Sequence, residues 1–112
     1  MTPRLTSGLL VQALLRLTES QGGFGMVLAK GDESAGAVAV ILLEKGRKPR
    51  FFERILSANG GYTWQSRSQV TEDNADFLEF LARRRKIDPD LWLIELDVAC
   101  AERFAAEMNS LC

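Results

Sequence analysis

The chain has 112 residues, the size of one domain, and leaves no room for two independent cores. Apolar residues make up 46% and charged residues 26%, close to the averages for a globular protein. The net charge of −1 excludes a whole-protein field that would steer the domain toward nucleic acid or an anionic membrane.

The first half of the chain predicts one helix and four strands. Thr6 or Ser7 can cap a helix that ends at Gln21-Gly22-Gly23, because its apolar residues recur at helical spacing and glycine supplies the stop. The second predicted strand is apolar on both faces, which places it in the middle of a sheet. The predicted strands are 24–30, 35–43, 50–57 and 62–65, with Lys45-Gly46-Arg47-Lys48-Pro49 and Asn59-Gly60-Gly61 as turns.

The second half predicts two helices around one strand. Residues 71–86 form the clearest helix, with acidic residues in its first turns, basic residues in its last, and Phe77, Leu78, Leu81 and Ala82 on its buried face. Residues 91–97 form a fifth strand, and 98–111 a short helix. Because tight turns join consecutive strands, we expect residues 1–112 to form a single α+β domain. Its mainly antiparallel sheet has about five strands and packs with two or three helices.

Histidine is absent, which does most to restrict the chemistry. Its absence excludes Ser-His-Asp and Cys-His catalysis and every His-ligated metal site. Cys100 and Cys112 make no disulfide framework. No apolar run resembles a signal peptide or reaches the ~20 residues of a membrane span. We therefore expect a cytoplasmic protein with no cofactor, no bound metal and no membrane contact.

Several short motifs resemble those of a known family. They are Arg4-Leu5 with Ser7, Lys30-Gly31-Asp32 with Ala35-Gly36 at an expected first hairpin, Phe52-Glu53-Arg54, and Arg85 before Asp88-Pro89-Asp90-Leu91-Trp92 with Glu95. In this order they resemble the short alphaproteobacterial family called domain of unknown function 1491. The resemblance implies the fold and the compartment, but no activity, substrate or cofactor.

The segment from Asp88 to Trp92 has two interpretations. Its two aspartates with Glu95 could hold Mg²⁺ through oxygen ligands, as phosphoryl-transfer sites do. Alternatively, Asp88-Pro89 stops the helix, Asp90 accepts hydrogen bonds in the turn, and Trp92 fills the core. The structural interpretation is simpler, and we prefer it.

Two basic groups together contain nine of the 14 Lys and Arg residues. If they lay on one face, they would form a patch for phosphates or an acidic partner. Helix ends attract cations for their own stability, however, and no aromatic stacking platform accompanies either group. The groups are Arg83-Arg84-Arg85-Lys86 at a helix end and Lys45, Arg47, Lys48, Arg50 and Arg54 near a hairpin.

Three further expectations concern single side chains. Glu53 and Arg54 point to opposite faces of their strand, and one of them should form an internal ion pair with Arg83, Arg85, Asp88 or Asp90. The stem of Arg85 should lie along the buried helix face, with its guanidinium reaching an acid at Asp88, Asp90 or Glu53. Cys100 is expected to be a buried, inert thiol.

The sequence favours a non-enzymatic protein-interaction or accessory module, with a homodimer among the options. The alternatives are nucleic-acid or nucleotide binding through the basic groups, and a small carboxylate-dependent enzyme. The partner is not identified. The candidate contacts with a partner or ligand are Arg83, Arg84, Arg85, Lys86, Glu53, Asp88 and Asp90.

Overall fold

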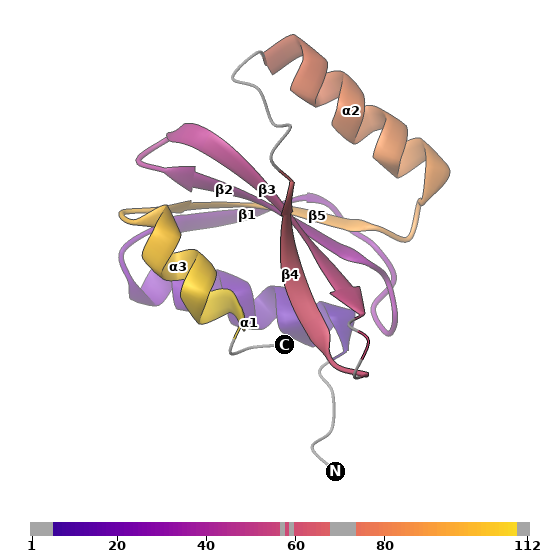
Figure 1. The fold of residues 1–112 in the computed structure, drawn as a ribbon, viewed down its shortest axis with the longest axis horizontal. Coiled ribbons are helices and arrows are strands. Elements are labelled where there is room, and N and C mark those ends of the chain that lie inside the picture. The colour runs from indigo at the N-terminus through magenta and orange to yellow at the C-terminus, as the bar shows by residue number, and fades with distance from the viewer. Residues whose placement is uncertain (1–5, 57, 59, 68–73, 110–112) are drawn as a thin grey trace.

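A computed structural model describes residues 6–56, 58, 60–67 and 74–109 and contains three helices and five strands within them. The order of the elements confirms the predicted α+β class. They are α1 (Ser7–Ser20), β1 (Phe24–Ala29), β2 (Val38–Glu44), β3 (Arg47–Leu56), β4 (Tyr62–Arg67), α2 (Asn74–Ile87), β5 (Trp92–Val98) and α3 (Ala101–Met108) (Figure 1).

The sheet has the strand order β1-β5-β2-β3-β4 and is mostly antiparallel. Its one parallel pair is β2 with β5, where Val38 lies opposite Trp92. The expected first hairpin between the strands at 24–30 and 35–43 is therefore wrong, because β5 lies between β1 and β2. The prediction that the second strand is central is correct, since β2 is the third of five strands.

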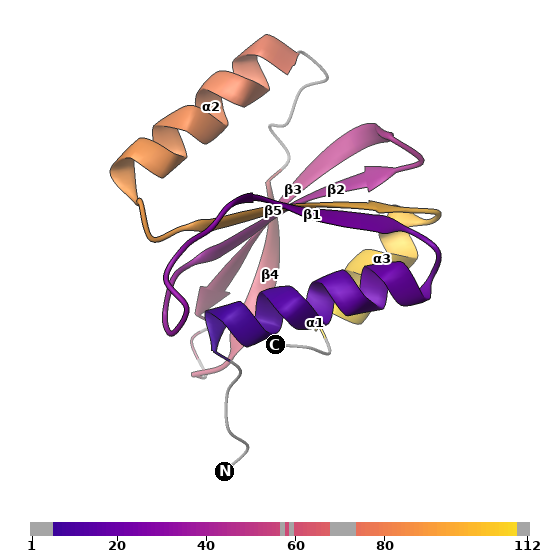
Figure 2. The same ribbon diagram turned by 180° about the vertical axis from the view of Figure 1, so that it is seen from behind.

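Helices α1 and α3 cover one face of the sheet, and the larger core lies beneath them (Figures 1 and 2). The Thr6 side chain accepts a hydrogen bond from the Leu9 N–H, which confirms the predicted helix cap. From α1, Leu10 and Leu14 are fully buried, and from α3 Phe104 and Met108 are too. The tail predicted as a helix thus forms α3, whose apolar residues complete this core.

Helix α2 lies on the opposite face and covers a smaller core. This core contains Leu81 of the helix, Leu91 just before β5, and Leu93, Ile41 and Phe51 of the sheet. Phe80 meets Phe51 edge to face, with ring centroids 5.4 Å apart. The predicted burial of Leu81 is confirmed, whereas Ala82 is exposed, and the side chains at 77 and 78 lie outside those described.

The turn between β2 and β3 is shorter than the predicted five-residue turn. Lys45 and Gly46 adopt positive φ angles of 51° and 76°, the backbone of a two-residue hairpin loop with the twist of the flanking strands. Strand β3 therefore begins at Arg47 and not at residue 50. No helix of the described part of the chain is long and apolar enough to cross a membrane.

Candidate functional site

The Asp88–Trp92 segment is the centre of a hydrogen-bonded junction. The Trp92 indole N–H donates to the Asp32 carbonyl at 2.7 Å, and the Asp32 N–H donates to the Asp90 carbonyl at 3.0 Å. Asp88 accepts from the Asp90 N–H through its carboxylate at 3.2 Å. Trp92 is 5% exposed. These contacts support the structural interpretation of the segment, in which Trp92 fills the core. The carboxylate that accepts a hydrogen bond in the turn is that of Asp88, however, whereas Asp90 accepts through its backbone carbonyl.

Two glycines allow this junction to close. A Cβ at Gly31 would lie 2.1 Å from the Asp90 carbonyl oxygen, and one at Gly36 would lie 2.3 Å from it. No side chain can occupy such positions unless the backbone moves. The Ser7 hydroxyl donates to the Gly36 carbonyl, so the start of α1 joins the same junction. Within the described ranges, no three acidic or cysteine side chains gather closely enough to hold a metal ion.

Arg84 connects α2 to the sheet through an ion pair with Glu53. Its guanidinium lies 3.0 Å from the Glu53 carboxylate, and the two side chains are 33% and 11% exposed. The expectation that Arg83 or Arg85 would be the partner is therefore wrong. Arg83 lies 3.8 Å from Glu79 in an exposed pair, and Arg54 stacks over the Tyr62 ring at 4.4 Å.

Arg85 binds backbone carbonyls, where an acidic partner was expected. Its guanidinium donates to the carbonyls of Pro89 and Leu91, each at 2.7 Å. The side chain thereby stabilises the turn between α2 and β5. Asp90 and Lys86 are exposed, and Asp88 is half-buried. Six of the seven predicted contact residues therefore belong to α2 and the turn after it, and the seventh, Glu53 on β3, meets them through its ion pair with Arg84.

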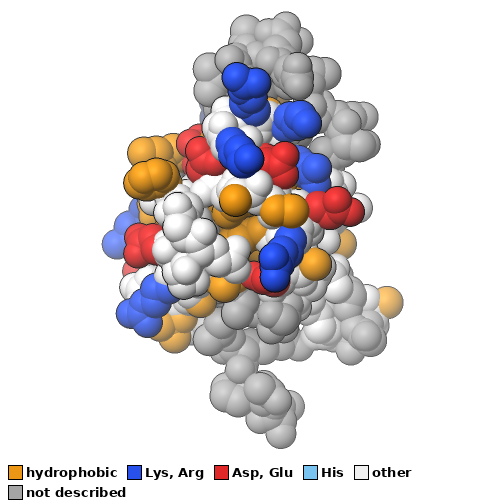
Figure 3. Space-filling view, turned by 90° about the vertical axis from the view of Figure 1, so that its left-hand side faces the viewer, with side chains coloured by type: hydrophobic (Ala, Val, Ile, Leu, Met, Phe, Trp, Pro, Cys, Tyr) orange, Lys and Arg blue, Asp and Glu red, His pale blue; other side chains and the backbone are white. Residues whose placement is uncertain are grey.

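Helix α2 and the β2–β3 turn, which carry most of the two basic groups, lie toward opposite ends of β5. Arg54 is the exception, because its neighbour Glu53 lies level with Leu93 near the start of β5. Helix α2 leads through the Asp88 turn into the start of this strand, while the Lys45 N–H donates to the Val98 carbonyl at its end. Seven strand residues separate the two ends by roughly 23 Å. On the face that carries the β2–β3 turn, basic side chains alternate with acidic ones (Figure 3).

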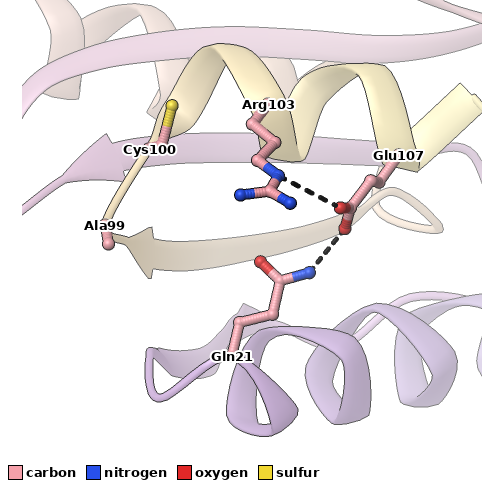
Figure 4. Close-up of a pocket in the computed structure, with 5 residues that line it drawn as sticks. All are labelled: Gln21, Ala99, Cys100, Arg103 and Glu107. Carbon is pink, nitrogen blue, oxygen red and sulfur yellow. Dashed lines mark hydrogen bonds and ion pairs between the residues drawn. The ribbon is translucent and has the colours of Figure 1, made fainter.

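A shallow groove lies between the end of α1 and the start of α3. Gln21, Ala99, Cys100, Arg103 and Glu107 line about 300 Å³ of it (Figure 4). Gln21 and Arg103 both point toward the Glu107 carboxylate, which accepts a hydrogen bond from the Gln21 amide at 2.5 Å. Cys100 is exposed, so the expectation of a buried thiol is wrong. The residue directly precedes α3, where the strand has already left the core.

A second hollow of about 250 Å³ adjoins the groove and reaches the edge of the sheet. It shares Gln21 and Ala99 with the groove and extends to Phe24, Lys45 and Asp97. Phe24 is the first residue of β1 and its side chain is 80% exposed. The hollow therefore ends at the most exposed aromatic ring among those described.

Strand β1 presents an apolar outer edge, which we call the β1 edge and define as Phe24–Leu28. Phe24 and Met26 are 80% and 56% exposed, and Val27 and Leu28 are 42% and 43% exposed. Among the described strands β1 pairs only with β5, so within this part of the chain the backbone groups on its outer side have no neighbouring strand. Edge strands normally avoid pairing with other chains because they contain charged residues or proline, and β1 contains neither.

A comparison with known proteins identifies the family. The family model described as "Protein of unknown function (DUF1491)" matches residues 5–106. The chain belongs to the DUF1491 family. No match is found among the curated proteins.

Solved structures from the DUF1491 family share this fold. A crystal structure of a family member from Caulobacter crescentus CB15 is 30% identical over 89% of this chain and 94% of its own, with a TM-score of 0.77. An NMR structure of a member from the same organism is 29% identical over 92% and 94%, with a TM-score of 0.76. The solution structure of protein Atu0922 from A. tumefaciens is 25% identical over 86% and 87%, with a TM-score of 0.71.

Most of the motif residues behind the DUF1491 resemblance have structural roles. Ser7, Gly31, Asp32, Gly36 and Trp92 meet in the junction at the start of β5. In Phe52-Glu53-Arg54, Phe52 belongs to the core, Glu53 pairs with Arg84, and Arg54 stacks on Tyr62. Arg4 and Leu5 lie outside the described residues.

Sequence reasoning missed the β1 edge. The pattern at 24–30 was read as a strand, but nothing in it says which strands lie beside it. A usable signal was present in the uncharged segment FGMVLA, because a strand without charge or proline is either central or an unprotected edge. Only the strand order decides between these two positions.

Proposed function

We propose that this protein is a cytoplasmic, non-enzymatic protein-interaction module that binds an extended segment of a protein partner along the β1 edge. The observation that carries the proposal is the exposure of four apolar side chains among the five residues Phe24–Leu28, two of them more than half exposed, on an outermost strand. A partner strand added there would form main-chain hydrogen bonds with β1 and cover these side chains.

The surroundings of β1 suit a strand better than a small ligand. An added strand needs a backbone edge together with side-chain contacts at every second residue, and both are available from Phe24 to Val27. The hollow beside Phe24 continues along Gln21 and Ala99 and offers room for side chains that follow the added strand. Both hollows are shallow and mixed in polarity, unlike the apolar pockets that enclose small molecules.

The residues first expected to contact a partner lie outside this surface. Arg84 and Glu53 pair with each other, and Arg85 binds the carbonyls of Pro89 and Leu91. No observation favours the carboxylate-dependent enzyme or nucleic-acid binding over the protein-interaction module. The Asp88 carboxylate is engaged in its turn and Asp90 is exposed. The basic residues at the β2–β3 turn are separated from those of α2 along β5, and Arg54 stacks on Tyr62.

Site-specific photo-crosslinking in cells tests the proposal. A benzophenone side chain at position 24 should capture a protein covalently, because a docked strand brings its backbone and side chains against this ring. The matched control is position 63, since Thr63 is exposed on β4, the opposite edge of the sheet. Capture from position 24 and not from 63 is the expected result. Capture of no protein from position 24, or equal capture from both positions, would overturn the proposal.

A further inference from the structure

We infer that the strand that occupies the β1 edge is β1 of a second copy of this chain, paired antiparallel about a two-fold axis at Met26. This inference rests on the proposed function and identifies its partner. The two five-stranded sheets would then form one continuous sheet of ten strands. Such a dimer is isologous, because the same surface of each copy makes the interface.

A two-fold axis perpendicular to the sheet keeps each side chain on its own face only if it passes through a residue, and we place it at Met26, the middle residue of Phe24–Leu28. An axis at Met26 places Met26 opposite itself and Gly25 opposite Val27 of the other copy. The branched Val27 side chain then lies beside a residue without one. Phe24 of one copy lies opposite Leu28 of the other, at each end of the paired segment. The Phe24 ring of each copy therefore lies near the bulge that interrupts the β1–β5 pairing after Val27 in the other copy.

Charge supports a second copy as the occupant. Self-pairing places each side chain of β1 against the same set, so any charge within the strand would meet a like charge nearby, and β1 has none. Lys30, which follows β1, falls opposite Gly22 in this register. The nearest acids on the same face are Glu95 and Asp97 of β5. Three strand spacings of about 4.8 Å separate them from their copies, which exceeds the screening length of about 10 Å at 0.1 M salt.

The size of the β1 edge predicts a weak association. Protein–protein contacts that bury less than roughly 1,200 Å² are typically transient. Four side chains and one short strand bury less than this area. A dissociation constant near 1 mM corresponds to only about 4.1 kcal/mol, so concentrations up to about 1 mM are needed to populate such a dimer. The equilibrium should therefore respond strongly to single changes at Met26.

Sedimentation velocity with a charge-swap series at Met26 tests this inference. The unmodified protein should dimerise as its concentration rises toward about 1 mM. Met26→Lys alone and Met26→Glu alone should each raise the dissociation constant at least about tenfold, because like charges then lie directly opposite. An equal mixture of the two variants should dimerise again, because Lys meets Glu across the axis. Thr63→Lys, on the exposed face of β4, is the matched control and should dimerise normally.

Each other outcome contradicts the inference in a recognisable way. A chain that stays monomeric throughout has no second copy at β1, and the protein-interaction proposal is then judged by whether position 24 captures a different protein. Dimers that persist in Met26→Lys would show that another surface associates. Two monomeric variants that fail to associate when mixed, although circular dichroism shows both folded, would exclude an axis at Met26.

Discussion

The two outer strands of the sheet end it in different ways. On β4, Trp64 is 8% exposed, its indole N–H donates to the Met108 carbonyl at 3.1 Å, and its backbone N–H donates to the Asn109 side chain at 3.4 Å. The end of α3 thus covers part of the β4 edge. Strand β1 has no such cover among the described residues, and its side chains are apolar and exposed. The outermost position of a strand is therefore not enough to make it a binding surface, because another segment of the same chain can cover its edge.

The largest difference between the two edges should appear in stability. Trp64→Ala should reduce the free energy of unfolding by roughly 3–5 kcal/mol, because it leaves a cavity in the core and removes the indole hydrogen bond. Phe24→Ala should change it by no more than about 0.5 kcal/mol, because an 80% exposed ring loses little burial. Urea denaturation of both variants at low protein concentration measures this difference. Equal losses at the two positions would mean that Phe24 is covered in solution.

On the sheet face that α2 covers, a partly buried ion pair can be compared with an exposed one. Arg84→Ala should reduce the free energy of unfolding by about 1–3 kcal/mol, because the Glu53 carboxylate, only 11% exposed, then loses its cationic partner. Arg83→Ala, which removes an exposed charge beside Glu79, should cost at most about 0.5 kcal/mol. Thermal unfolding of the two variants provides the comparison. A smaller loss for Arg84→Ala than for Arg83→Ala would show that α2 is not held by this pair.

Binding to generic duplex DNA tests whether a charged surface competes with the β1 edge. Four phosphate contacts from 83–86 would give a slope of log K against log salt of roughly −3 to −4. Since Arg84 and Arg85 are engaged within the protein, we expect weak binding with a slope no steeper than about −2. Fluorescence anisotropy over a salt series measures it. A slope near −4 would favour the nucleic-acid interpretation.

The smallest effect concerns single amides at the two edges. Amide hydrogens that face outward on β1 should exchange with solvent several-fold more slowly as the protein concentration rises, because a second strand accepts their hydrogen bonds. Amides on β4 should keep a constant rate over the same series. Hydrogen exchange followed by NMR resolves the two strands, and parallel slowing on both would locate the association elsewhere.

Local patterns predicted the elements well, and the relations between elements less well. The cap at Thr6, the central position of β2 and the burial of Trp92 follow from residues that are close in sequence or from composition. The insertion of β5 between β1 and β2 does not, because strand order depends on contacts between residues more than 50 positions apart. Phe24 is exposed because this insertion leaves β1 at the edge of the sheet, so the sequence did not predict its exposure either.

The ion pair shows the same limit within one helix. Arg84 and Arg85 are neighbours whose side chains leave the helix about 100° apart. The apolar residues at 78 and 81 suggested that Arg85 follows the buried face, but the rotation of α2 over the sheet turns Arg84 toward Glu53. The identity of the family could be predicted from short motifs, because each described motif holds the fold together where segments distant in sequence meet.

The position of β5 also decides when this protein can fold during synthesis. The strand that separates β1 from β2 is the last of the five to leave the ribosome, so the sheet cannot close until about residue 98 has emerged. Until then β2, whose seven residues include only one charge, has a neighbour on the β3 side alone. A nascent chain or a truncated product that lacks β5 therefore exposes its most apolar strand and is the species most prone to aggregate.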